Sequence, residues 1–143
     1  MITAVGILCG LLAAGCGSSD SPPPAYVAAG EAICGEQLTQ LNRLTRPSTL
    51  GQTVAYLPRV LAIMQAETGR LAALDPPSHG KDQLDAALTD TRALAALLRR
   101  SLHQLRAGMV EFTALSTLQS QSNTLRAQID AHFRQAGLAR CAE

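Results

Sequence analysis

Residues 81–107, KDQLDAALTDTRALAALLRRSLHQLRA, decide the fold that this sequence predicts. Leucines recur along one face of a helix: Leu84, Leu88, Leu94, Leu98, Leu102 and Leu105. Apolar residues at this spacing predict an amphipathic α-helix. Gly108 follows directly, and glycine is typical of the position just past a helix end. A helix with one apolar face must be covered, so the rest of the chain has to supply the covering surface.

Three further helices are predicted, over residues 24–45, 49–75 and 109–136. Thr49 and Gln52 form a capping-box pattern at the start of the second of these helices. Pro58 lies inside the same helix and predicts a kink, because proline lacks an N–H donor. Gly137 fits the left-handed position past the last helix, with Leu138 available for the packing contact that accompanies it. The weakest helical signal is residues 116–124, STLQSQSNT, whose hydroxyl and amide side chains compete for backbone hydrogen bonds.

The composition favours helices packed on helices. Of the 143 residues, 47% are hydrophobic but only 3% are aromatic, and tryptophan is absent. The core must therefore consist of Leu, Ala, Val and Ile. Because short connections make neighbouring helices antiparallel, residues 24–143 are predicted to form an all-α, up-down-up-down four-helix bundle. The alternative is a three-helix bundle in which the second helix is broken at Pro58.

The first residues resemble the signal of a bacterial lipoprotein. The uncharged apolar run from Ile2 to Ala14 is shorter than the roughly twenty residues of a transmembrane helix, but it fits the hydrophobic region of an export signal. Small residues at 13–15 then precede Cys16, as in a lipobox. The resemblance implies a signal peptide over residues 1–15, lipidation of Cys16 with palmitate-type acyl chains, and a flexible tether over 16–23. The alternative is an ordinary secretory signal with an unmodified cysteine.

This interpretation gives the chain a location. We expect a lipid-anchored protein of the cell membrane that faces the extracytoplasmic side. Cleavage before Cys16 would also remove Cys9 and leave Cys34 and Cys141, an even pair in a compartment where disulfides persist. The bundle topology brings the first helix and the chain end to the same pole, and Gly35 would allow close approach. We therefore expect a structural disulfide, with two free thiols or a redox pair as the alternative.

Three short stretches carry a second resemblance. AICGEQL from Ala32, LAALDPP from Leu71 and AGLARCAE from Ala136 are similar to stretches of small exported all-α proteins of actinobacteria. No activity is assigned to that group, so the resemblance implies no catalytic residues.

Charge gives one candidate site. The chain carries 12 basic and 11 acidic residues, and this near-neutral balance lacks the basic excess of nucleic-acid-binding proteins. Within the predicted helix over 81–107, basic residues nevertheless gather on the later turns: Arg92, Arg99, Arg100, His103 and Arg106. One interpretation is that these cations stabilise the helix dipole. The other is an anion-binding patch, at the pole opposite the tether, for a wall polymer or an envelope protein.

Signatures of catalysis or of bound metal are absent. The sequence contains no nucleotide-binding loop, nucleophile elbow or paired-cysteine zinc pattern. We therefore predict no catalytic residue, metal or cofactor, and a binding or structural interaction protein of the cell envelope rather than an enzyme. The alternative is a carrier that holds a small ligand or cofactor in the bundle interior. Thr68, Thr91 and Ser122 would then line a cavity, unless their hydroxyls bond to their own helices.

Overall fold

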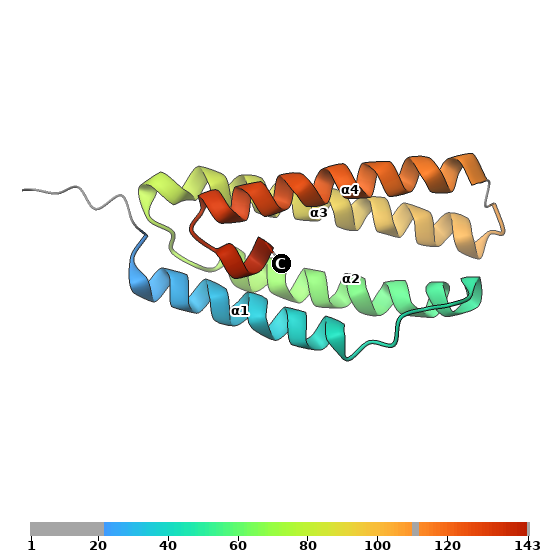
Figure 1. Cartoon of the computed structure of the whole chain (residues 1–143), viewed down its shortest axis with the longest axis horizontal. Helices are drawn as coiled ribbons and strands as arrows, with labels where there is room; N and C mark the ends of the chain where they lie inside the picture. Colours follow the sequence, from blue (N-terminus) through green and yellow to red (C-terminus); the bar gives the residue numbers. More distant parts are fainter. Residues whose placement is uncertain (1–21, 110–111, 143) are drawn as a thin grey trace, which may run out of the picture.

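A computed structural model describes residues 22–109 and 112–142 of the chain. It confirms the predicted all-α, up-down-up-down four-helix bundle (Figure 1). The helices are α1 (Pro24–Asn42), α2 (Leu50–Ala72), α3 (Ser78–Arg106) and α4 (Phe112–Gln135), followed by the short 3₁₀ helix η1 (Ala139–Ala142). The described residues contain no β-strand.

Helix α2 runs without interruption through Pro58, so the three-helix alternative is wrong. A proline inside a helix removes only its own N–H donor, and packing on α1 and α3 holds the remaining turns. Four predicted boundaries differ by three residues: the ends of α1 and α2 and the starts of α3 and α4. Helix α1 ends at Asn42 rather than Thr45, because the amides of the next two residues bond three positions back and close the turn. Helix α3 begins at Ser78, one turn earlier than predicted, directly after Pro77.

The predicted capping of α2 is confirmed in part. The side chain of Thr49 accepts a hydrogen bond from the Gln52 amide at 3.2 Å. The Gln52 side chain, however, does not return to the Thr49 amide as in the standard capping box. Its oxygen Oε1 instead accepts from the Ser48 amide at 2.8 Å and from the Ser48 hydroxyl at 3.0 Å. The Gln52 side chain therefore bonds to Ser48, one residue before the position that the sequence pattern indicates.

Two glycines end helices as predicted. Gly108 has φ = 69° and Gly137 has φ = 82°, a backbone conformation that disfavours other residues. After α4, the Leu138 amide donates to the Phe133 carbonyl at 2.9 Å, the long hydrogen bond of a Schellman motif. Leu138 is completely buried, so it provides the predicted packing contact.

Helix α4 also continues through residues 116–124, where the helical signal was weakest. The hydroxyls there bond to their own helix rather than compete with it. Thr117 donates to the Thr113 carbonyl at 3.0 Å, and Thr124 donates to the Ser120 carbonyl at 3.1 Å. Because these hydroxyl groups are satisfied within the helix, they do not compete for its backbone hydrogen bonds.

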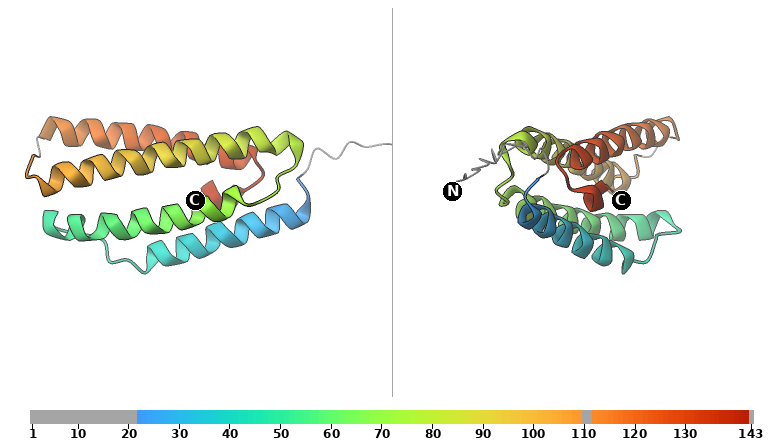
Figure 2. Two further views of the ribbon diagram at one scale, coloured as in Figure 1. Left: turned by 180° about the vertical axis from the view of Figure 1, so that it is seen from behind. Right: turned by 60° about the vertical axis from the view of Figure 1, so that its left-hand side comes forward.

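Each helix packs on its sequence neighbours, and η1 completes the bundle. Among the described residues, no Cα atom of α1 lies within 8 Å of a Cα atom of α4, whereas η1 contacts both helices. Figure 2 shows η1 between these two helices, and α1 running along only part of the length of α2. Most leucines of the predicted stripe on α3 are buried: Leu84, Leu88, Leu94 and Leu102.

Candidate anion-binding site

The structure joins Cys34 in α1 and Cys141 in η1 by a disulfide, the pair that the sequence predicted. Their Cα atoms are 5.0 Å apart, and 107 positions separate them in the chain. The neighbouring Gly35 allows the tail to approach, because a Cβ atom there would lie 2.8 Å from Cζ of Arg140. The disulfide thus fixes the chain end to α1.

The predicted lipidation site lies outside the described residues. This applies to Cys16, to the signal peptide over 1–15 and to residues 16–21 of the tether. In the part of the chain that the structure describes, no helix combines the length and the apolar character needed to span a membrane.

The five basic residues predicted as one patch fall into three sets on α3. Arg92 and Arg99 line a groove between α2 and α3. Arg100 faces the other way and lines the surface between α3 and α4. His103 and Arg106 are exposed on the last turns of the helix. The patch therefore wraps around α3 instead of occupying one face.

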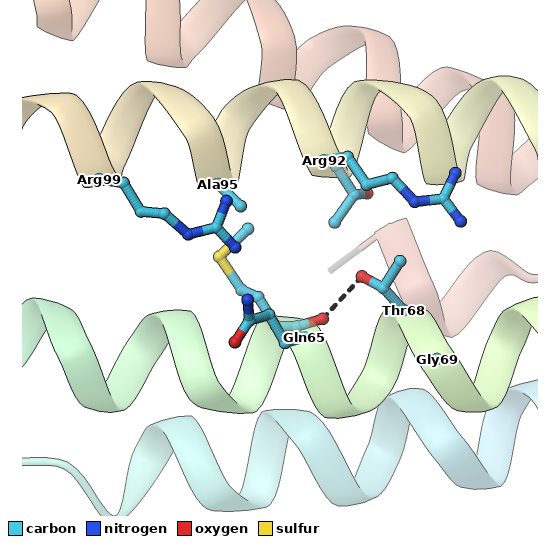
Figure 3. A pocket seen from close by; sticks show the side chains of 8 residues that line it. Gln65, Thr68, Gly69, Arg92, Ala95 and Arg99 are labelled. Atoms are coloured by element: carbon cyan, nitrogen blue, oxygen red, sulfur yellow. Dashed lines mark hydrogen bonds between the residues drawn. The ribbon is translucent and has the colours of Figure 1, made fainter.

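One groove beside these arginines lies between α2 and α3. It has a volume of about 490 Å³. Its lining consists of Met64, Gln65, Thr68 and Gly69 from α2, and of Thr91, Arg92, Ala95 and Arg99 from α3. Figure 3 shows the two arginines extending from α3 with Ala95 between them, above Gln65 and Thr68 of α2. The side chains of Met64 and Ala95 are buried and form an apolar floor.

The hydroxyls considered as cavity-lining groups bond to their own helices. Thr68 donates to the Met64 carbonyl at 2.6 Å, and Thr91 donates to the Ala87 carbonyl at 2.8 Å. Both residues line the groove, but their donors are already used. Ser122 lies on α4 and does not line this groove.

The cations of the groove lack acidic neighbours. No aspartate or glutamate belongs to its lining, and among the described residues neither Arg92 nor Arg99 forms an ion pair. Other cations do form ion pairs, such as Lys81 with Asp85 at 2.8 Å. Arginine presents a planar fork of donors that matches carboxylate and phosphate groups. The groove therefore offers two free guanidinium groups to an anion.

Tertiary structure reveals a larger pattern of charge that the sequence analysis missed. Residues 68 and 69 of α2 face residues 91 and 92 of α3 across the groove. The ion pairs Glu36–Arg70 and His132–Asp90, which involve neighbouring positions on these two helices, therefore lie at one level along the bundle. Going away from the start of α1, the last acidic residues on the four helices are Glu36, Glu67, Asp90 and Asp130. The described residues beyond them are 37–66, 91–109 and 112–129, here called the distal part. The remaining described residues, 22–36, 67–90 and 130–142, form the proximal part.

The distal part contains no acidic residue. It carries eight exposed arginines: Arg43, Arg46, Arg59, Arg92, Arg99, Arg100, Arg106 and Arg126. The proximal part has eight acidic residues, namely Glu31, Glu36, Glu67, Asp75, Asp82, Asp85, Asp90 and Asp130, and only four basic ones, namely Arg70, Lys81, Arg134 and Arg140. Glu111 falls between two distal segments in sequence and lies outside the described residues. Although the net charge of the chain is near zero, the described bundle is basic at one end and acidic at the other.

Helix dipoles explain only part of this separation. Cations on the last turns of α3 do stabilise its C-terminal end. Helix α2 begins at the distal end, where the dipole favours acidic residues, yet its first turn has none. Arg59 and Arg126 lie in the middle of their helices, where the effect of the dipole is small. The helix dipoles therefore do not account for Arg59 and Arg126.

Two buried polar groups and one half-buried ion pair also escaped the sequence analysis. Glu67 is only 7% exposed, and burial raises its pKa to about 7. Its position three residues after Met64 and four before Leu71, on the apolar face of α2, could have revealed this. The hydroxyl of Tyr26 is buried without a hydrogen-bond partner among the described residues. His132 and Asp90 meet at 3.1 Å across α4 and α3.

Comparison with known proteins adds no family or relative. No protein-family model matches the chain, and no curated protein or solved structure is significantly similar to it. Within the described residues, no cluster of three or more His, Cys, Asp or Glu side chains could hold a metal ion. The candidate function therefore rests on the residues and their geometry.

Proposed function

We propose that this chain is a lipid-anchored binding protein of the cell envelope, and that its distal part holds an anionic partner. The observation that carries the proposal is the charge separation of the bundle, in which the exposed arginines of the distal part have no acidic residue among them. Like charges gathered in this way repel one another, and an anion relieves that repulsion.

Two features support the location. The small residues before Cys16 match the pattern of a lipidation signal. The disulfide between Cys34 and Cys141 suits an oxidising compartment, because cytosolic thiols are kept reduced. The described chain begins at the proximal end, so a tether before Pro24 would attach that end to the membrane and direct the arginines away from it.

The arrangement of the arginines favours a polymer over a small ion. They lie on the connection between α1 and α2 and on α2, α3 and α4, so they surround the distal part instead of converging on one point. An anionic wall polymer with repeated charges can contact several of them at once. An acidic envelope protein is the second candidate for the partner. In either case the chain acts by binding, without catalysis and without a cofactor.

Fractionation tests the anchor. The wild-type protein should be found in the membrane fraction with acyl chains on Cys16, and Cys16→Ala should release it from that fraction. Mass analysis of the processed N-terminus distinguishes a lipidated Cys16 from an ordinary secretory cleavage. A wild-type protein found wholly in the cytosol, with residues 1–15 still attached, would contradict the proposal.

Binding to long-chain polyphosphate, as a soluble probe, tests the partner class. The variant Arg46→Gln/Arg100→Gln/Arg106→Gln removes three distal charges outside the groove. We expect this variant to bind polyphosphate at least tenfold more weakly. The slope of log K against the logarithm of the salt concentration should become shallower by about 0.7 to 0.9 for each arginine removed. The matched control, Arg70→Gln/Lys81→Gln/Arg134→Gln, removes three proximal charges and should leave that slope unchanged. Equal losses in both variants would show that net charge alone is responsible.

A further inference from the structure

We propose that the groove between α2 and α3 binds a long-chain carboxylate, with its headgroup at Arg99 and Gln65 and its acyl chain along Met64, Ala95 and the two threonines. This proposal does not depend on the lipid anchor or on the polymer site proposed above. The groove proposal itself rests on the geometry and charge of the lining residues, and it stands or falls separately.

The floor of the groove suits an apolar chain. Met64 and Ala95 are 8% and 5% exposed, and both line it. The hydroxyls of Thr68 and Thr91 donate to carbonyls of their own helices, so they need no bond from a ligand. Gly69 adds no side chain, and a Cβ atom there would meet nothing within 4 Å. The volume of about 490 Å³ is within the range of small-molecule sites, roughly 300 to 1,000 Å³.

The charged groups fix the direction of the ligand. Figure 3 shows the Arg99 side chain reaching across the groove toward Gln65, whereas the Arg92 side chain extends away from Gln65, past Thr68. The two arginines are two turns apart on α3, about 10 Å along its axis. A guanidinium group binds a carboxylate through two parallel hydrogen bonds, and the Gln65 amide can donate a third. At the other end, the aliphatic part of Arg92 covers the chain while its charge remains in water.

The sign of the charge argues against cationic and uncharged amphiphiles. No acidic side chain lines the groove, so a cationic headgroup would find no partner there. An uncharged chain would leave both guanidinium groups without a counterion. A carboxylate at the end of an acyl chain satisfies the apolar floor and the Arg99 end together.

Fluorescence titration of the full chain with cis-parinarate, an 18-carbon fluorescent carboxylate, tests the site. Palmitate should compete with the probe, whereas methyl palmitate and acetate should compete at least tenfold less well. Arg99→Gln should weaken binding about tenfold, and Arg92→Gln less than threefold. Competition by the methyl ester equal to that by palmitate would overturn the assignment of the headgroup to Arg99.

A filled groove provides the second test. Gly69 lines the groove and a Cβ atom there meets nothing within 4 Å, so we expect a bulky side chain in Gly69→Phe to weaken parinarate binding at least tenfold. Gly51→Phe is the matched control, because Gly51 lies on the same helix, is equally open and does not line the groove. Its affinity should stay within twofold of wild type. Wild-type affinity in Gly69→Phe would overturn the proposal.

The two proposals fail separately. Arg46→Gln/Arg100→Gln/Arg106→Gln leaves the groove lining intact, so it should reduce polyphosphate binding and keep parinarate binding within twofold. Gly69→Phe should do the reverse. Joint loss of both ligands in either variant, with an unchanged circular dichroism spectrum, would contradict the separation of the two sites.

Discussion

Leu138, the third residue after α4, packs so tightly against Gly30 of α1 that a Cβ atom on residue 30 would overlap its Cδ2 atom. Leu138 is completely buried, so it cannot move aside into solvent. The contact fixes the path of the chain end next to the disulfide.

Gly30→Ala should therefore destabilise the bundle. In an open helix position the same change is favourable by about 0.5 to 1 kcal/mol. Here we expect a loss of about 1 to 3 kcal/mol, because the methyl group overpacks a closed contact. Urea denaturation measures it. Gly51→Ala is the control, since nothing lies within 4 Å of a Cβ atom there, and it should be neutral or stabilising. A stabilised Gly30→Ala variant would contradict the close approach of Leu138.

Glu67 should make stability depend on pH. Burial raises its pKa from 4.5 to about 7, so the folded state holds this proton more tightly than the unfolded state does. The free energy of unfolding should fall as the pH rises from about 4.5 to about 7, by up to about 3 kcal/mol, and the effect of this group should level off above that range. Denaturation of wild type and Glu67→Gln at pH 5, 6, 7 and 8 isolates the contribution.

The glutamine variant should lose this part of the slope and be more stable than wild type at pH 8. Asp82→Asn, which removes an exposed carboxyl group on α3, should keep the wild-type slope over the same range. An unchanged slope in Glu67→Gln would show that the carboxyl group is solvated.

The disulfide should contribute substantially to stability. It closes a loop of 107 residues between Cys34 and Cys141, worth up to about 5 kcal/mol in the chain-entropy model. Cys34→Ala/Cys141→Ala should lower the Tm, and a reductant should lower the Tm of wild type but not of the variant. Alkylation followed by mass analysis of the purified protein provides the direct measurement. Two alkylated thiols at these positions without prior reduction would contradict the bridge.

Removal of one hydroxyl should stabilise the protein. The Tyr26 hydroxyl is buried without a hydrogen-bond partner among the described residues, and burial raises its pKa. Tyr26→Phe keeps the ring and removes the desolvated group, so we expect a gain of up to about 1 kcal/mol in denaturation experiments. Tyr56→Phe, at a half-buried position, should change stability by less than about 0.5 kcal/mol. Loss of stability in Tyr26→Phe would indicate that the hydroxyl has a partner.

Much of the fold could be predicted because its signals are local. The leucine stripe of α3 follows the helical repeat, and Gly108 and Gly137 occupy left-handed positions that other residues avoid. Helix α4 was harder to predict, because its hydroxyl-rich middle is compatible with both a loop and a helix. In the structure, the hydroxyl groups donate to the carbonyls one turn back, which is compatible with the helix. The end of α1 was also missed, since small differences in hydrogen bonding decide where a helix frays.

The candidate site could be predicted only in part. Arg92 and Arg99 were identified, but the groove needs Met64 and Gln65, which the register of α2 against α3 brings opposite them. Glu67 carries a sequence signal, its place on the apolar face. The pair of His132 and Asp90 carries none, because 42 positions separate the two residues.

By itself, the sequence determined which segments are helices, where α3 and α4 end, and which cysteines form a pair. Those features depend on hydrogen bonds and apolar spacing within a few residues, and on the parity of the cysteines. Only the tertiary structure decided that eight arginines from distant segments share one end of the bundle, and that α2 and α3 enclose a groove with an apolar floor. The distribution of charge and the position of cavities depend on which helices face each other and in what register. Packing between residues that are distant in the sequence sets that register.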